Sequence, residues 1–114
     1  MEQVCFALPV KTGETEDARA FMRELDGPRK AEFDKSERRI GITKESWFLQ
    51  HLGENDVLIG YMESADFAKS LQQFAQSRDD FDVWFKRRML QVTGVDLNHP
   101  PAGPLSEQLS RYEA

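Results

Sequence analysis

Two periodicities of hydrophobic and polar positions run along the chain and predict an α+β domain. Three short apolar segments of strand length are predicted strands: 4–10, 45–52 and 57–62. Four segments with apolar residues at helical spacing are predicted helices: 15–25, 29–39, 64–75 and 77–92. The polar link between the second and third strands is so short that they should form an antiparallel hairpin.

The order of these elements is that of a ferredoxin-like fold, an antiparallel sheet with helices on one face. Both faces of the hairpin strands carry apolar residues, because Trp47 and Leu49 alternate with Phe48 and Leu52. A single layer of helices would leave the other face in water. A second copy of the chain, packed sheet against sheet about a two-fold axis, would cover it. The sequence therefore predicts a homodimer.

The chain divides into a ferredoxin-like domain over 1–97 and a proline-rich C-terminal arm over 98–114. Residues 95–97 are either a fourth strand or an extended connector, and the pattern leaves both open. The arm is expected to pack on the domain or on the partner subunit. A last helical turn or two is expected after Ser106, docked by Leu105 and Leu109.

Charge and composition narrow the classes of partner. The formal net charge is −5, from 15 Lys and Arg against 20 Asp and Glu, so a polyanion would be repelled overall. The basic run Lys86-Arg87-Arg88 is best explained as a solvated helix face, and nucleic acid is not an expected partner. The chain shows no apolar run of membrane-spanning length and no signal segment, so a cytoplasmic location without membrane contact is expected. Cys5, the single cysteine, is expected to be buried in the first strand.

Three stretches resemble an uncharacterised bacterial family of dimeric α/β-barrel proteins. They are 39–50 (RIGITKESWFLQ), 81–86 (FDVWFK) and the glycine- and proline-rich ending 94–105 (GVDLNHPPAGPL). The resemblance implies a ferredoxin-like dimeric α/β barrel, distantly similar in fold to antibiotic-biosynthesis monooxygenases and EthD-like proteins. Some members of that wider superfamily are cofactor-free enzymes that act on aromatic or polyketide-like compounds between sheet and helices. The resemblance places no catalytic residue on this chain.

His51 is the candidate for proton transfer, because its intrinsic pKa lies near neutrality and it shares a strand face with Trp47. Tyr61 on the neighbouring strand and Trp84 on the last helix would complete a pocket with aromatic walls, into which the polar ends of His51 and Tyr61 would point. Arg88, one helical turn after Trp84, would bind a carboxylate or enolate at the pocket edge. Each has a plainer explanation: a partly wet strand histidine, core aromatics and a surface ion pair. No metal-ligand spacing or cofactor motif is present, so neither a metal nor a cofactor is expected.

Two hypotheses about function stay open. In the first, the protein is a homodimer that binds a small apolar or aromatic molecule in a pocket lined by Trp47, His51, Tyr61, Trp84 and Arg88. It would be a cofactor-free enzyme of the monooxygenase, cyclase or isomerase type, acting on an aromatic or polyketide-like compound. In the second, it is a non-enzymatic structural or interaction domain whose aromatics fill only the core and the dimer interface. A ligand-sized cavity would favour the first hypothesis, and a tightly filled interior would favour the second.

Overall fold

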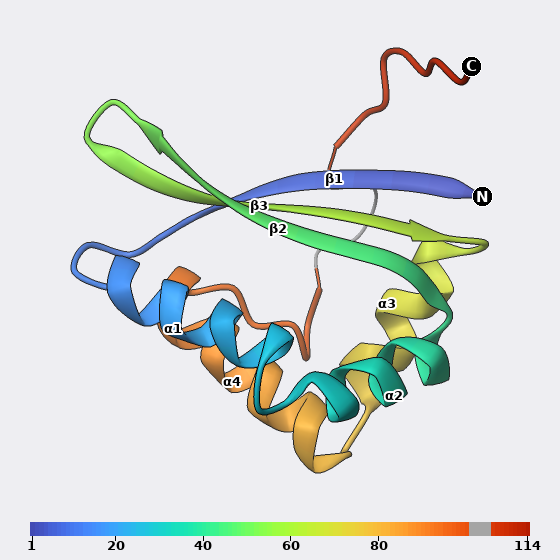
Figure 1. Cartoon of the computed structure of the whole chain (residues 1–114), viewed down its shortest axis with the longest axis horizontal. Coiled ribbons are helices and arrows are strands. Elements are labelled where there is room, and N and C mark those ends of the chain that lie inside the picture. Colours follow the sequence, from blue (N-terminus) through green and yellow to red (C-terminus); the bar gives the residue numbers. More distant parts are fainter. Residues whose placement is uncertain (101–105) are drawn as a thin grey trace.

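The computed structural model describes residues 1–100 and 106–114, and over these residues the chain forms an α+β domain. Its strands and helices follow one another in this order: β1 (Glu2–Pro9), α1 (Thr15–Asp26), α2 (Lys30–Ile40), β2 (Ile42–Leu52), β3 (Asn55–Ser64), α3 (Phe67–Gln76) and α4 (Asp80–Thr93). The helices lie together on one face of the sheet (Figure 1). The predicted strands and helices are confirmed, with shifts of a few residues at their ends.

The sheet is open and antiparallel, with the strand order β1-β3-β2. In its register, Gly60 of the central strand β3 lies between Phe6 and Trp47. Tyr61, also of β3, lies between Cys5 of β1 and Ser46 of β2. The strand order is consistent with a ferredoxin-like sheet.

Residues 95–97 are a connector and not a strand. The side chain of Asp96 accepts a hydrogen bond from the backbone nitrogen of Asn98 (2.9 Å), and the Asp96 carbonyl accepts one from the backbone nitrogen of His99 (3.1 Å). These bonds close a turn, so the chain bends before it can extend as a strand. Val95 and Leu97 instead pack against the core.

Glycine and aspartate residues set several helix ends. α2 ends at Gly41, whose φ of 83° is left-handed, and the chain turns there directly into β2. α4 begins after Asp79, whose side chain accepts a backbone hydrogen bond in the first turn. α3 is capped by Asp66 and not by Ser64, because Ser64 is buried at the end of β3 with its hydroxyl bonded to that of Ser70.

The core lies between the sheet and the helices, and aromatic side chains join its elements. The ring of Phe85 in α4 contacts Phe21 of α1 edge to face, with centroids 5.0 Å apart. It contacts Phe74 of α3 in the same way, at 5.4 Å. Much of the aromatic content of the chain therefore holds the helices to one another.

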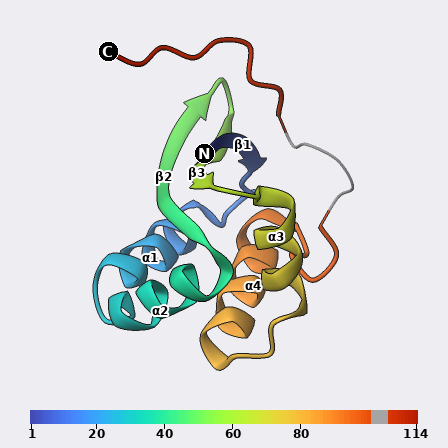
Figure 2. The same ribbon diagram turned by 90° about the vertical axis from the view of Figure 1, so that its right-hand side faces the viewer.

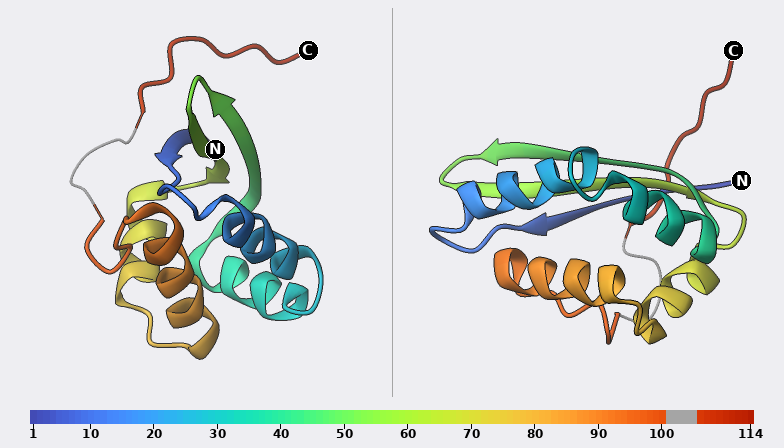
Figure 3. Two further views of the ribbon diagram at one scale, coloured as in Figure 1. Left: turned by 90° about the vertical axis from the view of Figure 1, so that its left-hand side faces the viewer. Right: turned by 60° about the horizontal axis from the view of Figure 1, so that its bottom comes forward.

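Within residues 1–100 and 106–114, no helix covers the second face of the sheet (Figure 3). Cys5, Ala7, Phe48, Ile59 and Tyr61 lie on this side, which we call the open sheet face. Phe48 is 58% exposed there. Cys5 is exposed as well, so its predicted burial is wrong, because the strand alternation turns its side chain away from the helices.

Residues 106–114, which we call the terminal segment, run beside β1 and continue on the side of the sheet opposite the helices (Figures 1 and 2). The hydroxyl of Ser106 donates a hydrogen bond to the carbonyl of Cys5. The helical turn predicted after Ser106 is wrong, since the terminal segment is irregular. Leu109 is 86% exposed, so no apolar contact supports so short a helix. Leu105 lies outside the described residues.

Candidate functional site

A cavity of about 260 Å³ lies between the helices and the sheet. Its walls include Phe6 and Trp47 from the sheet and Phe74 and Phe85 from the helices, and nearly all of its lining is apolar. Side chains in protein cores ordinarily leave few voids larger than a water molecule. A space of this size is therefore the first candidate for a ligand site.

Two glutamates, Glu37 of α2 and Glu45 of β2, line this cavity, and we call them the carboxyl pair. Their carboxyl groups lie close enough for each to shift the pKa of the other. The indole Nε1 of Trp47 donates a hydrogen bond to Oε2 of Glu45 (2.8 Å). Glu45 thus accepts a hydrogen bond from the sheet at the edge of an apolar space.

Burial raises the pKa of both carboxyls, because their charged forms lose water. The pKa of Glu45 rises to about 6, and hydrogen bonds from Trp47 and Glu37 limit the rise by favouring the carboxylate. The pKa of Glu37 rises much further, because repulsion by Glu45 and by Asp82 adds to burial. At neutral pH the carboxyl pair therefore holds one proton between its two groups.

Local sequence patterns explain how the carboxyl pair comes to face the cavity. Alternation along β2 puts Glu45 on the same face as Trp47, two residues further on. On α2, Phe33, Glu37 and Ile40 share one face at helical spacing, and all three line the cavity.

Gly60 makes room for the ring of Trp47. A Cβ atom at position 60 would lie 2.9 Å from Cη2 and Cζ3 of Trp47 and 3.0 Å from Cε2 of Phe6. With glycine there, both rings lie against β3 and contact each other edge to face, with centroids 5.7 Å apart. Because Trp47 bonds Glu45, the small residue on β3 also helps to position the carboxyl pair.

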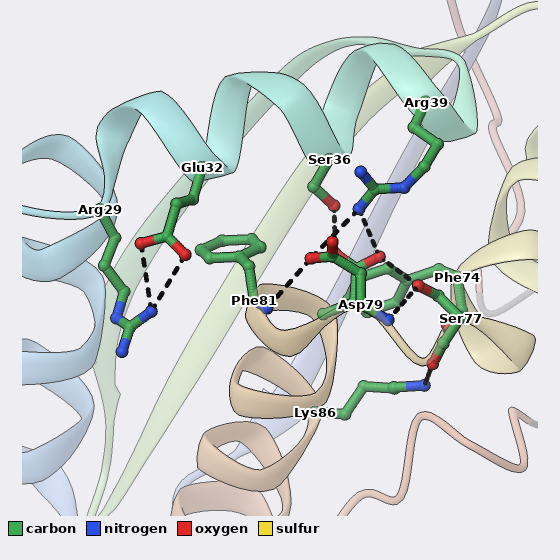
Figure 4. Close-up of polar contacts among 10 residues, drawn as sticks. Arg29, Glu32, Ser36, Arg39, Phe74, Ser77, Asp79, Phe81 and Lys86 are labelled. Carbon is green, nitrogen blue, oxygen red and sulfur yellow. Dashed lines mark hydrogen bonds and ion pairs between the residues drawn. The ribbon is translucent and has the colours of Figure 1, made fainter.

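A buried polar network fixes α2 against α4 (Figure 4). Asp82 of α4 has no exposed surface and accepts hydrogen bonds from the hydroxyls of Ser36 and Ser77, both at 2.5 Å. It also forms an ion pair with Arg39 (2.8 Å). Ser36 and Arg39 flank Glu37 on α2, so this network fixes the place of that carboxyl.

Lys86, one turn further along α4, closes the end of α3 (Figure 4). Its ammonium donates hydrogen bonds to three backbone carbonyls, those of Phe74 (3.1 Å), Ala75 (3.1 Å) and Ser77 (2.9 Å). Burial lowers the pKa of Lys86, and the negative charge of Asp82 opposes that shift. The expected solvated basic face is therefore wrong for Lys86, which is buried.

The carboxyl pair also lines a depression on the outer surface between α2 and β2. Phe33 and Ile42 line both the depression and the cavity. These four side chains therefore stand between the cavity and the outside, and a ligand that enters here would meet the carboxyl pair first.

Of the predicted site residues, Trp47 lines the cavity, whereas His51 and Tyr61 lie elsewhere. His51 is near the tip of the hairpin, where its side chain is 66% exposed and its Nδ1 contacts Asp56. Tyr61 lies on the open sheet face, and its hydroxyl donates a hydrogen bond to Glu63 (2.6 Å). His51 and Tyr61 therefore do not share a pocket with Trp47.

Trp84 and Arg88 of α4 do not line the cavity either. Trp84 packs against Phe21 (5.4 Å between centroids), and the guanidinium of Arg29 lies 4.2 Å from its ring centroid. Arg88 donates hydrogen bonds to the side chain of Gln91 (2.7 Å) and to a backbone carbonyl of α1 (3.2 Å). Both residues bind helices together in this arrangement.

The sequence reasoning missed Glu37 and Glu45, although a signal was present. Glu45 occupies an inward position of an apolar strand, and Glu37 lies on the one apolar stripe of a charged helix, with Phe33 and Ile40. A carboxylate at an inward position is costly unless it finds a partner or gains a proton. The partner itself depends on how α2 lies against β2, which no local pattern states.

The fold and the cavity define a small α+β domain with a ligand-sized interior space. Residues 1–99 match DUF6176, a family of unknown function, and the chain belongs to this family. Comparisons with curated proteins and with solved structures found no match. Within residues 1–100 and 106–114, no helix has the length and apolar character needed to cross a membrane. The same residues contain no group of three or more histidine, cysteine or acidic side chains placed to hold a metal ion.

Proposed function

We propose that the cavity binds a small apolar molecule and that the carboxyl pair transfers a proton from and to it, without a cofactor. The observation that carries the proposal is the placement of two carboxyl groups together at the edge of an apolar cavity, where burial raises the pKa of both. A carboxylate with a pKa of about 6 is an effective base at neutral pH. A carboxyl kept neutral by burial can donate a hydrogen bond to an oxygen that gains negative charge.

In the proposed reaction, Glu45 removes a proton from a carbon next to a carbonyl group of the substrate. The electron pair of the broken C–H bond moves toward the carbonyl oxygen, and the hydroxyl of Glu37 stabilises the enolate by a hydrogen bond. In a β,γ-unsaturated ketone the enolate extends to the γ carbon, so return of the proton from Glu45 to that carbon gives the conjugated isomer and restores the carboxyl pair. No electrons are gained or lost, so these two side chains suffice.

An aromatic or polyketide-like compound suits the apolar lining of the cavity. Cyclisation would begin with the same proton removal, and a cofactor-free monooxygenase would pass the resulting carbanion to dioxygen. An isomerase is the reaction type that the carboxyl pair supports most directly, because it needs no second reactant.

Deuterium exchange tests the proton transfer. Aromatic ketones are incubated with the protein in D₂O, and exchange at the carbon next to the carbonyl is followed by NMR. We expect protein-dependent exchange that falls by about 100-fold or more in Glu45→Gln, because the base is lost. Glu32→Gln is the matched control, since Glu32 is on α2 but forms a surface ion pair with Arg29. Exchange at the full rate in Glu45→Gln, or no exchange with any ketone, would contradict the proposal.

The exchange rate should also depend on pH in a defined direction. The rate should rise as pH increases through about 6, because Glu45 must be ionised to accept the proton. It should fall at higher pH, because Glu37 must keep its proton to donate a hydrogen bond, and its pKa is raised. If the rate already levels off at a pH near the ordinary glutamate pKa, burial does not raise the pKa of Glu45 and the expectation fails.

The second candidate is a non-enzymatic structural or interaction domain, and the contacts among Phe21, Phe74 and Phe85 favour a packing role for those rings. That hypothesis predicts a tightly filled interior. The cavity of about 260 Å³ is not what it predicts, so the ligand-binding hypothesis is the better supported.

We also propose that the protein is a homodimer, a dimeric α/β barrel of two ferredoxin-like subunits packed through their open sheet faces. Ala7, Ile59 and Phe48 stand in one row across the three strands of that face, and no helix of the described part of the chain covers them. Removing this apolar surface from water favours association. The terminal segment lies on the same side of the sheet (Figure 2), and its Leu109 and Tyr112, 86% and 87% exposed, would find a partner surface there.

Sedimentation equilibrium tests the assembly. Phe48→Asp should be monomeric, because pairing would bury an unpaired charge. Leu90→Asp is the matched control: Leu90 is 43% exposed but lies on α4, so the dimer should persist. Cys5 gives a second readout, since its thiol should react with a maleimide faster in Phe48→Asp than in the wild type. A wild-type protein that sediments as a folded monomer at micromolar concentration would end the proposal.

A further inference from the structure

The polar side chains of the cavity lining differ in what they can offer a ligand. Among the described lining residues, the hydroxyl of Ser36 is engaged by Asp82 (2.5 Å) and that of Ser70 by Ser64 (2.8 Å). The Nε1 of Trp47 is likewise engaged by Glu45. The carboxyl pair is therefore the one titratable side-chain feature of this described lining, and it lies at one end of the space.

The carboxyl pair also sets the charge that a ligand meets. With one proton shared between two carboxyls, the cavity edge carries one negative charge beside apolar walls, where charges interact more strongly than in water. Three basic residues line the outer depression: Lys30, Arg38 and Lys44. Lys30 is exposed, and the side chains of Arg38 (paired with Asp34, 3.0 Å) and Lys44 (paired with Glu63, 3.6 Å) are 80% and 62% exposed, so water screens all three cations and they compensate little inside the cavity.

The volume of the cavity limits the ligand to a small ring system. A cavity of about 150 Å³ is known to hold benzene. By proportion, the present cavity of about 260 Å³ holds roughly ten non-hydrogen atoms, which is one substituted ring or two small fused rings.

From these three observations we propose that the site selects uncharged ring compounds with a single polar end, a carbonyl or phenolic oxygen, and rejects carboxylates of the same shape. The oxygen binds at the carboxyl pair, next to the outer depression, and the ring fills the apolar space beyond it. The inference rests on the proposed ligand cavity and names its substrate class. It differs from the expectation that Arg88 would bind a carboxylate at the pocket edge, because Arg88 does not line this cavity.

Matched isosteres test this selection. Acetophenone, benzamide and benzoate have nearly the same shape, and at neutral pH only benzoate is charged. Their dissociation constants are measured by calorimetry or ligand-observed NMR. We expect the two neutral compounds to bind at least about tenfold more tightly than benzoate to the wild type, because benzoate would place a second negative charge beside Glu45.

Two variants show whether the carboxyl pair causes the selection. Glu45→Gln removes the charge while its amide oxygen still accepts from Trp47, so the preference for neutral compounds should shrink several-fold. Glu37→Gln keeps the ionised Glu45, so the preference should remain. Circular dichroism confirms that each variant is folded. Benzoate binding as tightly as acetophenone to the wild type, an unchanged preference in Glu45→Gln, or no binding of either neutral compound would overturn the inference.

Deuterium exchange separates this inference from the proposed reaction. Selective binding without any exchange would leave the ligand class standing and remove the enzymatic proposal. Exchange without selection between neutral and charged isosteres would do the reverse.

Discussion

At the scale of single residues, the chemistry of the cavity depends on a contact between a glycine and an indole. Gly60 leaves room on β3 for the ring of Trp47, and the Nε1 of that ring holds Glu45 at 2.8 Å. The glycine therefore acts on the carboxyl pair through one intermediate side chain, although it carries no functional group itself.

Gly60→Ala should move the ring of Trp47, because the new methyl group would lie 2.9 Å from two ring carbons. We expect a loss of about 1–3 kcal/mol in the free energy of unfolding, measured by urea titration. The tryptophan emission should shift as well. Ser46→Ala, a substitution at an exposed position of the neighbouring strand, should change the stability by less than about 0.5 kcal/mol. If the alanine variant is as stable as the wild type and its emission is unchanged, the new methyl group fits without moving the ring of Trp47, which contradicts the prediction.

At the scale of elements, α2 has two functions that its sequence combines. Its inner face presents Phe33, Glu37 and Ile40 to the cavity, and its neighbouring residues Ser36 and Arg39 bind Asp82 of α4. The buried carboxylate of Asp82 thus holds α2, the helix that carries Glu37, in place. Its negative charge also contributes to the raised pKa of Glu37.

Asp82→Ala should destabilise the fold by about 3 kcal/mol or more, because it leaves the hydroxyls of Ser36 and Ser77 without their buried acceptor. Asp34→Ala removes an aspartate from the exposed side of α2, where its ion pair with Arg38 is in water, and should cost less than about 1 kcal/mol. Chemical unfolding of both variants gives the comparison. Equal losses for the two variants would show that the buried network contributes no more than a surface ion pair.

Periodicity predicted the elements well, because strand and helix patterns are local. The sequence also suggested Trp47 as a pocket residue, and Trp47 lines the cavity. It could not place the site, because the meeting of Glu37 with Glu45 depends on the tertiary contact between α2 and β2. The position of Tyr61 could not be predicted for the same reason. A shift of one residue in the pairing of β3 with β2 would change which β2 side chains share a sheet face with Tyr61.

At the scale of the whole molecule, all helices of the described residues lie on one side of the sheet, and the other side carries the apolar row of Ala7, Ile59 and Phe48. The helical side encloses the cavity, and the open sheet face is the surface for which we propose a second subunit. The terminal segment lies on that same side, held to β1 through Ser106 and through Arg111, which donates a hydrogen bond to the carbonyl of Met1 (3.1 Å).

Deletion of residues 106–114 should weaken the proposed dimer without unfolding the domain. Leu109 and Tyr112 touch little of their own subunit, so their apolar area is available for a partner, and we expect a rise of about tenfold or more in the dissociation constant. Glu107→Ala, at an exposed position of the same segment, is the control and should leave the constant unchanged. Sedimentation provides the measurement. A truncated protein that dimerises as tightly as the wild type would assign no role to the terminal segment.

The most direct test of the whole account is the protonation state of the carboxyl pair. Infrared spectroscopy distinguishes the C=O stretch of a neutral carboxyl from the bands of carboxylates. Because burial raises the pKa of Glu37 far above 4.5, the wild type should keep a neutral carboxyl band at neutral and mildly alkaline pH, and Glu37→Gln should lack it. A wild-type spectrum whose last neutral carboxyl disappears near the ordinary glutamate pKa would contradict the account.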